Sequence, residues 1–74
     1  MENRVRDFRN RCGLTQEELA QSIEVTRQTI GLIEAGRYNP SLKLCIAIAK
    51  TLSATLDEIF WMGEEDHVQA KTDY

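Results

Sequence analysis

Apolar side chains recur along this chain every three or four residues, a spacing that predicts amphipathic helices. Val5, Phe8 and Cys12 provide the first example, with arginines between them. Gly13 follows where a helix C-terminal cap belongs, because glycine adopts the left-handed backbone that closes a helix at little cost. We therefore predict a first helix over residues 3–12.

Hydroxyl residues mark the starts of the next two predicted helices. Thr15 is followed three residues later by Glu18, which has the form of a capping box and predicts a second helix up to about residue 22. After only three more residues, Thr26 is a second cap candidate, and it predicts a third helix over about residues 26–34. A tight turn therefore joins these two helices.

Residues 35–40 interrupt the helical pattern. Gly36 ends the third helix and Pro40 cannot continue a helix interior, so Ser41 or Asn39 is expected to cap the next helix. The fourth helix has a wide apolar side, which predicts that it is buried at the centre of the fold. That side comprises Leu42, Cys45, Ile46, Ala49 and Leu52, widened by Leu44 and Ile48.

A second capping box, formed by Thr55 and Glu58, opens a short last helix that is expected to run through Phe60. The residues that follow are polar and show no periodic pattern. We therefore expect an all-α fold, in which one compact five-helix domain over residues 1–62 precedes an acidic tail over residues 63–74.

The 74 residues carry a net charge of −3, which on its own disfavours a nucleic-acid partner, because lysine and arginine drive phosphate binding. The charge is unevenly distributed, however. Residues 1–50 carry eight basic and six acidic side chains, whereas residues 51–74 carry one basic and six acidic. This asymmetry is typical of a basic binding region followed by a solvated acidic tail.

Several classes of protein are disfavoured by the sequence. The longest apolar run covers residues 45–49, far short of the roughly 20 residues of a membrane-spanning helix, and a cytoplasmic location is expected. The two cysteines stand 33 positions apart without a metal-binding pattern, so we expect reduced thiols and neither a metal nor a cofactor. No constellation of catalytic side chains is found, and we expect no enzymatic activity.

A helix, a three-residue turn and a second helix form the unit that places its second helix in a major groove of DNA. The residue types fit this geometry, since Ala20 is small where the two helices approach and Val25 fills the turn. The outward positions of the third helix are Arg27, Gln28 and Thr29. Arginine and glutamine form bidentate hydrogen bonds with guanine and adenine edges. An ordinary solvated helix face is the alternative for these side chains.

Four segments, LTQEELA, VTRQTI, IEAGRYNPS and LDEIF, occur here in the order and spacing of a known family. From about Arg4 to Trp61 the chain resembles the lambda-repressor-like family, which includes phage repressors, Cro and the bacterial xenobiotic-response-element regulators. The resemblance implies the five-helix repressor fold and binding to double-stranded DNA. Glu24 departs from it, because the family commonly has glycine at this turn position.

The resemblance also implies roles for individual residues. Gln16 would contact a phosphate and brace the recognition helix, Thr26 would cap that helix and contact the DNA backbone, and Arg9 would pair with Glu34. The base-edge contacts would come from Arg27, Gln28 and Thr29. The phosphate contacts after the third helix would come from Arg37, Tyr38 and Asn39, together with the N-terminus of the fourth helix.

The sequence therefore predicts a homodimeric transcriptional regulator that binds a palindromic operator and, as in much of the family, represses. The dimer interface is assigned to Phe60, Trp61 and Met62, whose alternative role is to close the core of the monomer. Two rival functions stay open: an antitoxin that represses its own operon, and a protein-interaction module that has kept the fold without DNA binding.

Overall fold

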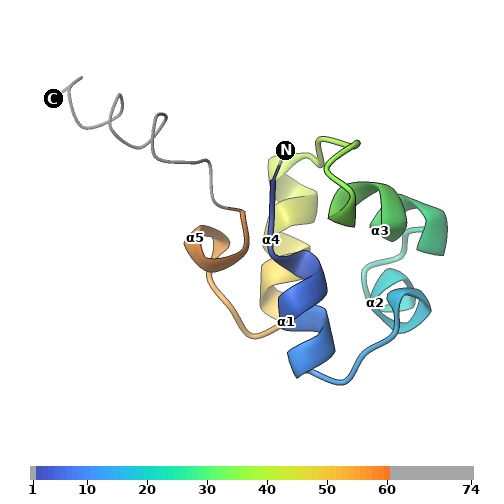
Figure 1. The fold of residues 1–74 in the computed structure, drawn as a ribbon, viewed down its shortest axis with the longest axis horizontal. Helices are drawn as coiled ribbons and strands as arrows, with labels where there is room; N and C mark the ends of the chain where they lie inside the picture. The colour runs from blue at the N-terminus through green and yellow to red at the C-terminus, as the bar shows by residue number, and fades with distance from the viewer. Residues whose placement is uncertain (1, 61–74) are drawn as a thin grey trace, which may run out of the picture.

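The computed structural model describes residues 2–60, and it confirms the all-α fold over that part of the chain. In Figure 1, α5 lies on one side of α4, and α2 and α3 lie together on the other side. The five helices are α1 (Val5–Arg11), α2 (Gln16–Ser22), α3 (Arg27–Glu34), α4 (Leu42–Thr51) and α5 (Leu56–Ile59).

Every helix after α1 begins with a hydroxyl cap. In each case the side-chain oxygen accepts a hydrogen bond from the backbone amide three residues later, at 3.0–3.2 Å. The four caps are Thr15, Thr26, Ser41 and Thr55. Glu18 and Glu58 complete two capping boxes by accepting from the amides of the cap residues at 2.8 Å. The predicted helix starts are confirmed, and Ser41 rather than Asn39 caps α4.

The helices α1 to α4 all end in the same way, on one residue with a left-handed backbone. These residues are Gly13, Glu24, Gly36 and Ser53, with φ of 73°, 61°, 75° and 56°. After each of them the next amide turns back to a carbonyl five residues earlier, as when Val25 N–H donates to the Ala20 carbonyl at 2.9 Å. In all four cases the left-handed residue stands two positions after the last residue of the helix.

One core holds the helices together. Ala20 is buried between α2 and α3, as predicted, and Ile30 and Ile33 are the inward side chains of α3. The buried cluster consists of Val5, Leu19, Ala20, Ile30, Ile33, Ile48, Ala49, Leu52 and Ile59. Burial of its valine, leucine and isoleucine side chains contributes about 1.5–3 kcal/mol each to folding, so this cluster is the main source of stability.

The apolar side predicted for α4 is wrong at two positions. Leu42 is 68% exposed and Ile46 is 38% exposed, whereas Cys45 and Ile48 are buried. Leu42 and Ile46 stand one turn apart at one edge of the apolar stripe. The neighbouring helices cover the centre of the stripe and leave this edge open.

The last described helix is shorter than predicted, because α5 ends at Ile59 and Phe60 follows it with φ −107° and ψ 70°. Phe60 is half-buried and packs against the monomer's own core. Trp61, Met62 and the predicted tail over residues 63–74 lie outside the described residues. Among residues 2–60, no helix is long and apolar enough to cross a membrane.

Candidate nucleic-acid interface

The α2–α3 unit has the geometry that the sequence predicts. Three residues, Ile23 to Val25, and the N-cap Thr26 lie between the two helices, and the left-handed Glu24 makes the turn. A Cβ atom added at Gly31 would lie in ordinary van der Waals contact with Nε2 of Gln16, at 3.9 Å. Ala20 of α2 and Ile30 and Ile33 of α3 belong to one buried cluster, which holds the two helices together.

The outward face of α3 is centred on Gln28. At about 100° per residue, Gln28 points opposite to the midpoint of the buried Ile30 and Ile33. Arg27 is also exposed and flanks this face. Thr29 lies at its other edge, half-buried, with its Oγ1 3.0 Å from Oγ1 of Thr26. Of the three side chains predicted to face outward, Arg27 and Gln28 are exposed, and Thr29 is half-buried beside the helix cap.

Gln16 connects the start of α2 to α3. Its Nε2 donates to Oε1 of Glu34 at 3.1 Å, which orients the amide, because only its nitrogen can donate to a carboxylate. The amide oxygen consequently faces Arg27, whose Nη1 donates to it at 3.5 Å, a long contact. Gln16 therefore links the first residue of α2 to the last residue of α3.

Glu34 is the point where α1, α2 and α3 meet. Its side chain is fully buried, and both of its oxygens accept from Arg9, at 2.6 Å from Nε and 3.3 Å from Nη2. Arg9 also donates to the carbonyl of Leu14 at 2.8 Å. The Arg9–Glu34 pair implied by the resemblance is thus confirmed. Arg6, whose side chain is 66% exposed, brings a second guanidinium to 3.6 Å from the same carboxylate.

The environment of Glu34 determines its ionisation. Burial alone would raise the pKa of this carboxyl, because desolvation penalises the charged form. Hydrogen bonds from Arg9 and Gln16, the charge of Arg9 and a contact with Arg6 outweigh burial and hold the pKa of Glu34 below its ordinary value. The carboxylate is therefore charged at neutral pH and acts as a fixed anchor for the two cationic side chains.

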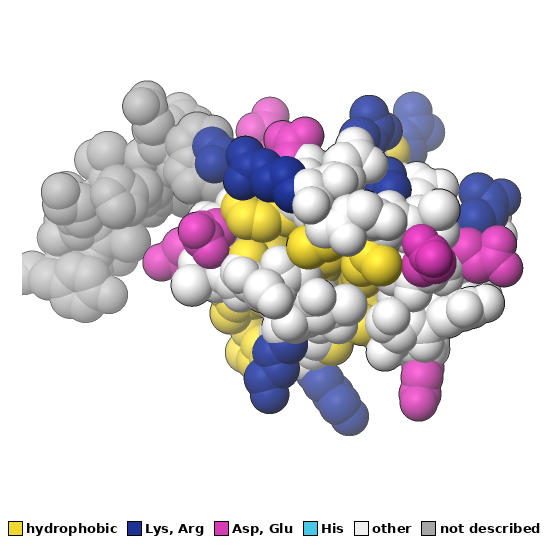
Figure 2. All heavy atoms as spheres, turned by 90° about the horizontal axis from the view of Figure 1, so that it is seen from below, with side chains coloured by type: hydrophobic (Ala, Val, Ile, Leu, Met, Phe, Trp, Pro, Cys, Tyr) yellow, Lys and Arg dark blue, Asp and Glu magenta, His cyan; other side chains and the backbone are white. Residues whose placement is uncertain are grey.

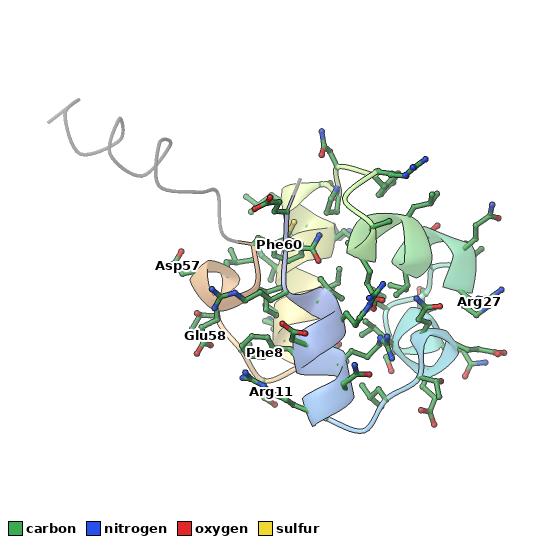
Figure 3. All side chains as sticks on the ribbon, in the orientation of Figure 1. Phe8, Arg11, Arg27, Asp57, Glu58 and Phe60 are labelled. Atoms are coloured by element: carbon green, nitrogen blue, oxygen red, sulfur yellow. The ribbon has the colours of Figure 1, made fainter. Side chains whose placement is uncertain are left out.

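The loop after α3 is exposed at the three positions predicted to hold phosphates. Arg37, Tyr38 and Asn39 are all exposed, and the loop lies at the top of Figure 1 between the end of α3 and the start of α4. Pro40, the next residue, is buried and fixes the loop to the domain. Figure 3 shows Arg27 at the far end of the same half of the molecule. The predicted contacts thus frame α3 at both of its ends.

Sequence reasoning missed two features of this region. The Gln16–Glu34 hydrogen bond joins residues 18 positions apart and leaves no local pattern to detect. Leu32, however, is 39% exposed on the outward side of α3, and helical spacing from the inward Ile30 and Ile33 was a sufficient signal to find it. No group of residues suited to a metal ion occurs between residues 2 and 60.

Comparison with known proteins gives a consistent picture. The helix-turn-helix family model matches residues 5–59. A protein named as an uncharacterized HTH-type transcriptional regulator, YgzD of Bacillus subtilis, is 44% identical over 66 residues, which cover 89% of this chain and all of that protein. A regulator of Archaeoglobus fulgidus, named in the same way, is 44% identical over 89% of this chain and 94% of its own length.

Solved structures agree. The restriction-modification controller protein C.AhdI of Aeromonas hydrophila superposes with a TM-score of 0.70 at 34% sequence identity, over 74% of this chain and 83% of that chain. The chain is therefore a member of the lambda-repressor-like helix-turn-helix family of DNA-binding transcriptional regulators.

Proposed function

We propose that this protein binds a specific sequence of double-stranded DNA by inserting α3 into the major groove. The observation that carries this proposal is the division of α3 into two faces. Ile30 and Ile33 lock its inward face into the core, while Gln28 stays exposed on the opposite side and Arg27 is exposed beside it. In this arrangement Gln28 reads an adenine edge, Arg27 reads a guanine edge or a nearby phosphate, and Thr29 contacts the rim of the groove.

Phosphate contacts on both sides of α3 would fix its register. Gln16 and Thr26 stand at the N-terminal ends of α2 and α3, where backbone amides favour anions. On the other side, phosphates would be held by Arg37, Tyr38 and Asn39 beside the N-terminus of α4. These contacts carry no sequence information themselves, but they determine which base pairs Gln28 meets.

The distribution of charge supports this orientation. Asp57 and Glu58 lie at the opposite end of the molecule from Arg27 (Figure 3). On the lower face of the domain, basic side chains are dispersed among acidic ones and form no single basic patch (Figure 2). With a net charge of −3, non-specific attraction to DNA is weak, so affinity must come from matched contacts around α3.

We further propose that the protein acts as a homodimer on a palindromic operator and represses. Two copies related by a two-fold axis would present their α3 helices about 34 Å apart to successive major grooves. Phe60, Trp61 and Met62 would contribute apolar anchors to the dimer interface. Occupation of a promoter by such a dimer excludes polymerase without any contact to it, so repression is the simplest outcome.

A reporter gene with the operator across its promoter should lose expression when this protein is present. A gain of expression would contradict repression.

The test of DNA reading is selection of bound sequences from a random duplex pool, followed by titration at two salt concentrations. We expect a two-fold-symmetric site, and Gln28→Ala should weaken binding to it by about 1–3 kcal/mol and relax the preference at one base pair. Gln21→Ala removes the same side chain from an exposed position on α2 and is the matched control, with unchanged affinity. A pool without enrichment even at low salt would contradict DNA reading and favour a protein-interaction module.

A further inference from the structure

Leu32 is the one large apolar side chain on the exposed side of α3. It is 39% exposed, whereas Ile30 and Ile33 on the same helix are fully buried. Leu32 stands four residues after Gln28, so the two side chains lie one above the other, one helical turn apart. The isolated domain thus leaves part of this aliphatic residue uncovered, and covering that part would be favourable.

The fold does not explain this leucine. The backbone carbonyl of Leu32 accepts from the Arg37 amide at 2.9 Å in the C-terminal cap of α3, but any residue supplies a carbonyl. The next outward position, Ala35, carries only a methyl group. Leu32 is therefore the large apolar side chain that the exposed side of α3 offers beside Gln28.

The major groove offers one apolar partner at the base edges, the C5-methyl group of thymine. A turn of α-helix advances about 5.4 Å and a base-pair step about 3.4 Å, so Leu32 reaches a base within about two steps of the one that Gln28 meets. A leucine side chain makes no hydrogen bond there. Its contact with a thymine methyl group is favourable because the apolar surfaces of both groups are removed from water.

We propose that Leu32 reads the C5-methyl group of a thymine in each operator half-site and selects thymine at that position. This inference rests on the proposed function, because it requires α3 to lie in the major groove. It adds to that function an apolar specificity contact beside the polar contact of Gln28, and it predicts that the operator carries an invariant thymine near the base read by Gln28.

The experiment replaces each thymine of the selected operator in turn by deoxyuridine, which pairs identically and lacks only the methyl group. Most of these single replacements should have little effect. At one position in each half-site, the single replacement should weaken binding of the unaltered protein by about fourfold, the effect expected for one buried methyl group. Leu32→Ala should bind the original operator more weakly and should be indifferent to the same replacement. Because Leu32 is exposed, the thermal midpoint of the variant should stay close to that of the parent.

Leu42→Ala is the matched control, since it shortens an exposed leucine on α4 and should keep the full sensitivity to deoxyuridine. Two results would overturn the role of Leu32 and leave DNA reading intact. One is a selected operator that is symmetric without an invariant thymine, and the other is that every deoxyuridine-substituted operator binds as well as the original. The role is also overturned if Leu32→Ala is as sensitive as the parent at the same thymine. Failure to select any operator overturns the proposed function and this inference together.

Discussion

Single residues with left-handed backbone close four of the five helices, and chemistry divides these residues into two kinds. Gly13 and Gly36 adopt positive φ without steric cost. Glu24 and Ser53 adopt it with a Cβ atom that crowds the following carbonyl, which costs roughly 1–2 kcal/mol. The departure of Glu24 from the family's glycine therefore changes the energy of the turn and not its shape.

Glu24→Gly should stabilise the domain by about 0.5–1 kcal/mol, which is the relieved strain less the greater freedom of glycine in the unfolded chain. Chemical denaturation followed by far-UV circular dichroism measures the change. Glu24→Ala is the control, because it removes the same carboxylate and keeps the Cβ atom, and it should bring no stabilisation. Equal stabilities of the two variants would mean that the charge of Glu24, and not its backbone, is what matters.

At the scale of elements, one buried carboxylate ties three helices together. Glu34 on α3 binds Arg9 on α1 and Gln16 on α2, so the position of α3 depends on a polar junction as well as on the core. A buried ion pair contributes little when intact, but removal of one partner leaves a charge without compensation. The junction is accordingly sensitive to acid as well as to mutation.

Stability should fall in acid through Glu34. Its pKa is lower in the folded than in the unfolded state, so its contribution is complete above the unfolded pKa of about 4.3 and disappears as the pH falls through the folded pKa. Glu34→Gln should cost about 3 kcal/mol at neutral pH and should flatten this part of the profile. The measurement is urea denaturation at a series of pH values. Glu17→Gln, at an exposed site, should keep the profile of the parent.

Local signals explain how much of the elements could be predicted from sequence. The starts of α2 to α5 were predicted correctly because a hydroxyl cap and its amide lie within four residues of each other. The exposure of Leu42 and Ile46 could not be predicted, because the same periodicity suits a wide or a narrow buried stripe. The neighbouring helices determine how much of the stripe is covered. The Arg9–Glu34 pair, 25 positions apart, was accessible only through family resemblance.

At the scale of the whole molecule, the proposed dimer depends on residues that follow α5. In Figure 3, Phe60 lies beside α4, on the α5 side of the domain and away from Arg27. Since Phe60 packs on the monomer's own core, its removal would report on stability as much as on assembly. Trp61 is the better probe, and a dimer built at this end would leave both α3 helices free for DNA.

Trp61→Ala should weaken the dimer by about 2 kcal/mol, roughly thirtyfold in its dissociation constant, if the tryptophan is an interface anchor. Light scattering across a concentration series measures the mass without DNA. Tyr38→Ala, which removes an exposed aromatic ring from the loop before α4, is the control and should stay dimeric. An unchanged monomer–dimer equilibrium in Trp61→Ala would place the interface elsewhere.

The shortness of α3 has a consequence for how the protein finds its target in a genome. Eight residues make a helix of about 12 Å, which lies along only three or four base pairs. A four-base-pair word recurs about every 256 base pairs, so one copy would meet thousands of matches among the roughly million competing sites of even a small genome. Two copies reading twice as many positions reduce the matches to the order of ten. In the proposed mode of binding, the length of α3 limits the number of base pairs that one chain can distinguish, and this limit favours the proposed pairing of two copies.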